Sequence, residues 1–156
     1  MERKYAEFAA TKACELLAID SPSGYTQKAA TWVKEAFEAL GFAAKITTKG
    51  GVLADLGGAD KDDALFLQAH TDTLGAMVAE VKANGRLKLT PLGGLRAENA
   101  ETENVRIHTR TGKIIEGTVQ LCNASVHVNG EYGETKRTFD TVEAVLDEDV
   151  KTAEDT

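Results

Sequence analysis

The sequence predicts an α/β fold for residues 1–74 and an antiparallel β region for residues 75–156. Two amphipathic helical patterns followed by a set of short strands suggest an α/β layer in the first part. After residue 74 the pattern changes to short alternating strands joined by glycine turns, with no helical period before the acidic end of the chain. We therefore expect two domains, with a boundary near residue 74.

The first two predicted elements are helices. Residues 3–18 carry apolar side chains at three-four spacing, and residues 20–24 end the pattern because proline and glycine both interrupt a helix. A second helix is predicted from Thr26, which suits an N-cap, to Leu40. Gly41 stands where a left-handed C-cap glycine belongs. The inward face of the second helix would consist of Ala29, Ala30, Val33, Phe37 and Leu40.

Short strands follow the helices. Residues 42–48 alternate in polarity, a turn at 49–51 leads into residues 52–56, and two glycines at 57–58 turn the chain again. In residues 64–70 apolar side chains occupy both odd and even positions, which predicts a strand buried on both faces, as in an α/β sheet.

Two hairpins and one further strand are predicted in the second part. Asn84-Gly85, the strongest short hairpin signal, separates two alternating segments at 77–81 and 86–89. Thr111-Gly112 separates two more, at 105–109 and 113–119, and residues 142–146 form another strand pattern.

Composition excludes several classes of partner. Hydrophobic residues make up 42% and charged residues 28% of the 156, which are globular values. The net charge of −7 argues against nucleic acid and against anionic membrane surfaces. No apolar run approaches the about 20 residues that a membrane helix needs, and the N-terminus lacks an apolar signal core. We expect a cytoplasmic protein.

Most residues that could carry chemistry lack a supporting pattern. Cys14 and Cys122 form no Cys-x-x-Cys pair, so we expect two buried or half-buried thiols without a thiolate zinc site or a redox motif. His108 and His127 have no acidic residue or cysteine at ligand spacing. The carboxylates that we interpret as solvated surface groups are Asp62, Asp63, Glu98, Glu101 and Glu103. The serines Ser21, Ser23 and Ser125 lie in no Gly-x-Ser-x-Gly motif.

His70 and Asp72 are the candidate site residues. They stand where the apolar segment at 64–70 ends, and the end of a buried strand is where α/β folds place their sites. Zinc binds neutral imidazole nitrogen, and a ligand histidine usually donates its other N–H to a carboxylate. His70 could thus be a metal ligand and Asp72 the carboxylate that orients it. The same tripeptide spacing also occurs without any function, so it needs structural context.

The order of segments resembles the co-catalytic, two-metal aminopeptidases of the tetrahedral, deblocking and glutamyl aminopeptidase type. The resemblance covers nearly the whole chain. The segments that carry it are Ser21-Pro22-Ser23-Gly24, Gly41-Phe42, Leu65 to Asp72, Leu74-Gly75, Asn84-Gly85, Leu92-Gly93-Gly94, Val105 to Val119 with Gly112 and Gly117, and Val142 to Asp147. One local departure is Thr73, which stands where the family often has an acidic residue.

The resemblance implies the N-terminal part of a zinc-peptidase-like α/β catalytic domain, residues 1–74, followed by an incomplete inserted antiparallel β-barrel-like domain, residues 75–156. It implies a cytoplasmic metallo-aminopeptidase that hydrolyses N-terminal peptide bonds, binds two divalent ions of zinc or cobalt, and forms homo-oligomers through the β domain. His70 matches a metal-ligand position, and Asp72 matches the catalytic aspartate that supports it.

The same resemblance limits what these residues do alone. The family's other metal ligands and its general-base glutamate lie beyond the β insertion, so we expect the 156-residue chain to be inactive. Two alternatives remain open at this level. One is a stand-alone assembly or interaction module without catalysis, and the other is a metal-dependent deacylase or carboxypeptidase of the same clan.

Overall fold

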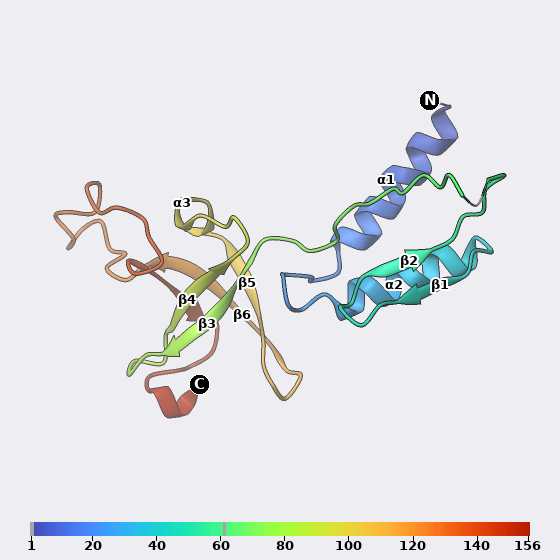
Figure 1. Ribbon diagram of the computed structural model, residues 1–156. Helices are drawn as coiled ribbons and strands as arrows, with labels where there is room; N and C mark the ends of the chain where they lie inside the picture. Colours follow the sequence, from blue (N-terminus) through green and yellow to red (C-terminus); the bar gives the residue numbers. More distant parts are fainter. Residues whose placement is uncertain (1, 61) are drawn as a thin grey trace. The chain divides into compact units, whose positions relative to one another are not determined.

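The computed structural model describes residues 2–60 and 62–156, and the chain divides into two compact units, Met1–Leu74 and Gly75–Thr156 (Figure 1). The first unit contains two helices and a two-stranded sheet, and the second contains a five-stranded sheet. Both sheets are antiparallel throughout. Each unit is described separately below.

The two predicted helices of the first unit are confirmed. Helix α1 spans Arg3–Leu17 and helix α2 spans Gln27–Ala39. Thr26 occupies the N-cap position of α2, although its side chain makes no capping hydrogen bond. Gly41 follows the helix with a φ of 89°, and the N–H groups of Gly41 and Phe42 donate to the carbonyls of Glu38 and Phe37. This is the Schellman ending, which explains why glycine closes this helix.

Two of the short strands predicted after α2 are also present, and they form a hairpin. Strand β1 (Ala44–Ile46) pairs with strand β2 (Val52–Ala54), and α2 lies against this pair (Figure 1). Ala29 and Ala30 are the buried residues of α2, with 0% and 3% of their surfaces exposed. Small side chains at these positions let the helix approach its neighbours closely.

The predicted inward faces of the helices are only partly buried. Leu40, which was expected to face inward, is 57% exposed. Helix α1 has no buried residue, and Tyr5, Phe8 and Leu17 on its apolar stripe are 56%, 47% and 69% exposed. An amphipathic pattern predicts which face of a helix can be buried, but the face is buried only if another helix or a sheet packs against it.

The prediction of a doubly buried strand at residues 64–70 is wrong for this structure. These residues form no strand and all of them are exposed, with Leu65, Phe66 and Leu67 at 85%, 71% and 74%. A strand exists only where neighbouring strands supply hydrogen-bond partners, and β1 and β2 pair with each other instead. Apolar composition alone therefore does not create the strand.

The second unit contains the predicted hairpins. The first joins β3 (Gly75–Val81) to β4 (Leu87–Leu92), with Gly85 at a φ of 74° in the turn. The second joins β5 (Asn104–His108) to β6 (Ile114–Leu121), with Gly112 at a φ of 84°. Positive φ is costly for residues with a Cβ atom, which explains glycine in both turns.

The final strand, β7 (Val142–Leu146), lies in the middle of the sheet rather than at its end. The strand order is β3-β4-β7-β6-β5, so β7 separates the two hairpins. Two short elements were not predicted, the helix α3 (Ala97–Ala100) and the 3-10 turn η1 (Ala153–Asp155). The core of this unit consists of Leu87, Leu89, Ala97, Ala100, Val119, Leu121, Val142, Ala144 and Leu146.

Gly117 permits close contact between β6 and β7. A Cβ atom at Gly117 would collide with the carbonyl oxygen of Val145 on the neighbouring strand. The absence of a side chain is therefore a packing requirement at this position. Within residues 2–60 and 62–156, neither α1 nor any other helix combines the length and apolar character that crossing a membrane requires.

Candidate functional site

His70 and Asp72 contact each other in the first unit. The Nδ1 atom of His70 lies 3.0 Å from the backbone oxygen of Asp72 and 3.1 Å from its Oδ1 atom. The imidazole is 85% exposed and the aspartate side chain 43% exposed. The pair therefore lies at the surface of the unit, and not at the end of a buried strand as expected.

The two oxygens beside Nδ1 determine the tautomer of His70. Carbonyl and carboxylate oxygens accept hydrogen bonds and do not donate them, so Nδ1 must carry the hydrogen. In the neutral ring Nε2 then keeps its free lone pair. The arrangement leaves Nε2 as the atom that can bind a metal, with Asp72 on the opposite side of the ring.

The loop between α1 and α2 holds this pair in place through Ser21 and Ser23. The Ser23 hydroxyl donates to Oδ2 of Asp72 at 2.6 Å. The hydroxyl of Ser21, a residue only 1% exposed, donates to the Thr71 carbonyl at 3.0 Å, and the backbone carbonyl of Ser21 accepts the Thr73 N–H at 2.9 Å. Pro22 and Thr73 form a parallel bridge at the same place. The two segments are thus joined through both backbone and side chains.

The same contacts perturb the acidity of Asp72. The hydrogen bond from Ser23 holds the pKa of Asp72 below its ordinary value of 3.8 and outweighs the desolvation that would raise it. The adjacent His70 acts in the same direction when it is protonated. Asp72 is therefore ionised at neutral pH, which keeps both of its oxygens as acceptors.

Sequence reasoning missed the role of Ser21 and Ser23. They lie in no nucleophile motif, and their segment was interpreted as the end of a helix and as part of the family resemblance, without a link to Asp72. A local signal was present nonetheless. Pro22, Ser23 and Gly24 form a turn in which Gly24 has a φ of 88° and the Tyr25 N–H donates to the Pro22 carbonyl at 2.8 Å. A turn with glycine at the third position fixes where the Ser23 side chain points.

The other histidines and the two cysteines do not form a site together. His108 lies on β5 opposite Ile114, and His127 is exposed in the loop between β6 and β7. Both cysteines are exposed, contrary to expectation. For Cys14 the reason is that no residue of α1 is buried.

The described side chains do not complete a metal site. Across residues 2–60 and 62–156, no group of three or more His, Cys, Asp or Glu side chains is arranged to hold a metal ion. His70 supplies one nitrogen, whereas a structural zinc site uses four protein ligands and a catalytic one usually three. The residues present therefore fit one ligand position of a metal centre, and not a whole centre.

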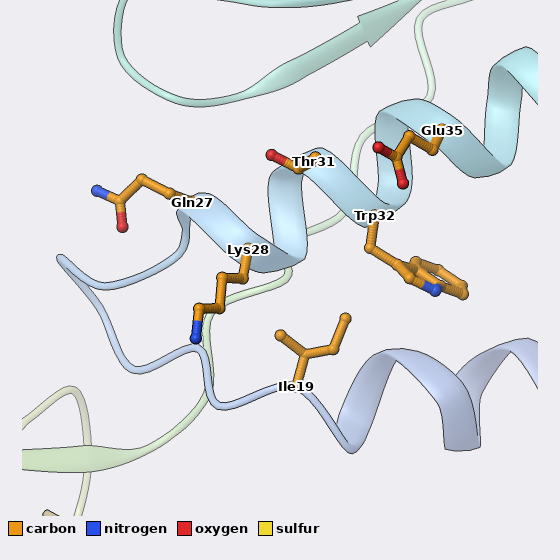
Figure 2. A pocket seen from close by; sticks show the side chains of 6 residues that line it. All are labelled: Ile19, Gln27, Lys28, Thr31, Trp32 and Glu35. Atoms are coloured by element: carbon orange, nitrogen blue, oxygen red, sulfur yellow. The ribbon is translucent and has the colours of Figure 1, made fainter. Parts of the chain in front are cut away.

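The first unit also contains a hollow that His70 and Asp72 do not line. It is lined by Ile19, Gln27, Lys28, Thr31, Trp32 and Glu35. Figure 2 shows Trp32 and Ile19 projecting into the space between α2 and the end of α1. The Lys12 ammonium lies 5.5 Å from the centre of the Trp32 ring. Neither His70 nor Asp72 lines the hollow, so it is not part of the candidate site.

The second unit contains a buried ionic cluster of a different kind. Glu143 on β7 is 1% exposed, and its two oxygens accept hydrogen bonds from Lys82 and Arg86, both at 2.6 Å. Burial alone would raise the pKa of Glu143, but the two cations outweigh it and the pKa lies below its ordinary value. Lys82 and Arg86 flank the turn between β3 and β4, so the cluster ties that hairpin to the centre of the sheet.

Comparison with known proteins identifies the family. The M42 glutamyl aminopeptidase profile matches residues 50–156. YhfE of Bacillus subtilis (strain 168), whose name assigns it to the aminopeptidases, is 39% identical over 142 residues, which are 91% of this chain and 41% of YhfE.

Solved structures share the fold. Aminopeptidase APDkam598 from the archaeon Desulfurococcus kamchatkensis superimposes with a TM-score of 0.77 at 20% identity, covering 90% of this chain and 37% of that protein. The dodecameric PhTET1-12s gives a TM-score of 0.72 at 18% identity, covering 93% of this chain and 41% of its own. The chain thus spans about two fifths of these relatives. By its sequence it belongs to the M42 glutamyl aminopeptidase family.

Proposed function

We propose that these residues form part of a metal-dependent aminopeptidase that hydrolyses N-terminal peptide bonds with a metal-activated water. In this proposal residues 1–74 are the N-terminal segment of the α/β catalytic domain. Residues 75–156 belong to an inserted antiparallel β-barrel-like domain. The family match and the antiparallel sheet of the second unit support this assignment.

The orientation of His70 is the observation that carries the proposal. Its Nδ1 atom faces two acceptors of Asp72, which leaves Nε2 for a divalent ion. We assign His70 as a metal ligand and Asp72 as the catalytic aspartate that orients it. In the intact enzyme two ions of zinc or cobalt would supply Lewis acidity and a nucleophile at neutral pH.

The isolated 156-residue chain is expected to be inactive. Its described residues offer a single ligand position, and one imidazole does not hold two ions. The test is hydrolysis of aminoacyl anilides by the purified chain with added zinc or cobalt, followed by absorbance. The His70→Ala variant is the control for adventitious metal or contaminating peptidase. Turnover that chelators abolish and that disappears in His70→Ala would overturn the expectation of inactivity.

The second unit offers a surface for assembly. Met77, Val78 and Val81 lie on β3, an edge strand of the sheet, and are 57%, 39% and 41% exposed. An exposed apolar edge strand can pair with another chain. We propose that the β domain mediates homo-oligomer formation in a cytoplasmic enzyme, in line with the dodecamer formed by PhTET1-12s. A peptide substrate would be the other partner of the intact protein.

A further inference from the structure

We propose that Ser23 is a positioning residue for the candidate metal site, acting through Asp72 to fix the tautomer and orientation of His70. The proposal rests on the assignment of His70 as a metal ligand. It concerns a contact between residues 49 positions apart, which no sequence pattern around His70 indicates. Three features of the structure support it.

The first feature is how the partners of Asp72 are divided. Oδ2 accepts the Ser23 hydroxyl at 2.6 Å, and Oδ1 lies 3.1 Å from Nδ1 of His70. A distance of 2.6 Å is typical of a strong hydrogen bond between a hydroxyl group and a carboxylate. Because Ser23 holds one oxygen, the carboxylate cannot rotate freely, and the other oxygen stays directed at the imidazole.

The second feature is that Ser23 is itself held in place. It lies in the turn closed by the Tyr25 N–H and the Pro22 carbonyl, where Gly24 supplies the positive φ. Next to it, the buried Ser21 binds the backbone on both sides of Asp72, at Thr71 and Thr73. A rigid support of this kind is needed if a hydroxyl group is to orient a side chain on another segment.

The third feature is the exposure of His70. With 85% of its side chain exposed, the ring has little packing to restrain it. Its described hydrogen bonds are the two from Nδ1 to Asp72, one to the backbone and one to the side chain. The orientation of the ring therefore depends on Asp72, both through its backbone oxygen and through the carboxylate that Ser23 holds.

The experiment measures the tautomer of His70 by ring nitrogen chemical shifts in the 156-residue chain labelled with nitrogen-15. The wild-type chain should show mainly the Nδ1–H form at His70, and exposed His127 should show the mixture of an unrestrained imidazole. In Ser23→Ala the ratio of Nδ1–H to Nε2–H should fall by about fivefold, which is roughly what one net hydrogen bond is worth. Ser23→Thr retains the hydroxyl and should keep the ratio near wild type.

Ser125→Ala is the matched control, because it makes the same change in the second unit. An unchanged ratio in Ser23→Ala with wild-type backbone spectra would overturn the proposal. If Ser23→Ala loses its fold, the wild-type chain still provides a test. A predominant Nε2–H form at His70 would contradict the contacts of Nδ1 with Asp72 and would overturn the proposal. Titration with zinc separates this result from the proposed function. If the tautomer behaves as expected but zinc does not perturb His70, the ligand assignment fails while the positioning role stands.

Discussion

Replacing Glu143 with glutamine tests the buried ionic cluster of the second unit. The carboxylate is 1% exposed and accepts hydrogen bonds from Lys82 and Arg86 at 2.6 Å. Glutamine has nearly the same shape, so the change removes the charge without creating a cavity. Its amide nitrogen would face one of the two cations, donor against donor, and that contact would be lost.

The expected cost follows from how far each of the three groups is buried. Removing one partner of a fully buried ion pair costs about 3–5 kcal/mol because the remaining charge stays unpaired. Here the remaining side chains, Lys82 and Arg86, are 34% and 37% exposed and can turn toward water. We therefore expect Glu143→Gln to lower the free energy of unfolding of the second unit by about 2–3 kcal/mol. For a domain of this size the melting temperature should fall by roughly 10–20 °C.

The effect should also depend on pH in a defined direction. The pKa of Glu143 is lowered in the folded state from an ordinary value of 4.5. A lowered pKa stabilises the fold above the unfolded-state value, and this stabilisation is lost as the pH falls through the folded-state value. The difference between wild type and Glu143→Gln should therefore be complete at pH 7 and shrink below about pH 4.5.

The assay is thermal unfolding by circular dichroism, combined with hydrogen exchange of the amides of β4, β6 and β7 to isolate the second unit. Glu134→Gln makes the same chemical change at an exposed loop position and should alter stability by less than about 0.5 kcal/mol. A Glu143→Gln melt close to that of Glu134→Gln would refute the reasoning. A deficit that does not diminish between pH 7 and pH 3 would show that the charge is not its cause.

Two further predictions concern packing. Gly117→Val should destabilise the second unit by about 1–3 kcal/mol in urea unfolding, because any Cβ atom there collides with the Val145 carbonyl oxygen. A variant that unfolds at the same urea concentration as the wild type would contradict this. The exposed side chains of Leu65, Phe66 and Leu67 should drive self-association of the 156-residue chain, and replacing all three with serine should reduce its mass in light scattering. A wild-type chain that is monomeric at high concentration would count against the second prediction.

The elements predicted well are those that local chemistry decides. The C-terminal end of α2 and the two hairpins of the second unit depend on glycines whose positive φ values are accessible without a Cβ atom. Gly41, Gly85 and Gly112 each act within a few residues of their own position. Helical periodicity and turn residues are likewise properties of short windows, so the sequence is enough to place them.

The elements predicted wrongly or missed depend on partners far away in the chain. Residues 64–70 have the composition of a buried strand, yet no described residue pairs with them. Strand β7 was predicted, but its place between β4 and β6 was not, because pairing order is not visible in a strand's own pattern. Helix α3, with four residues, is too short to produce a helical period.

The sequence by itself determined the secondary structure around most turns, and it singled out His70 and Asp72 through their spacing. Only the tertiary structure brought Ser23 to Asp72, across 49 positions, and Glu143 to Lys82 and Arg86, across 61 and 57. The physical reason is range. Backbone preferences and turn chemistry act between near neighbours, whereas a hydrogen bond between distant segments forms only after the chain has packed and its loop entropy has been offset.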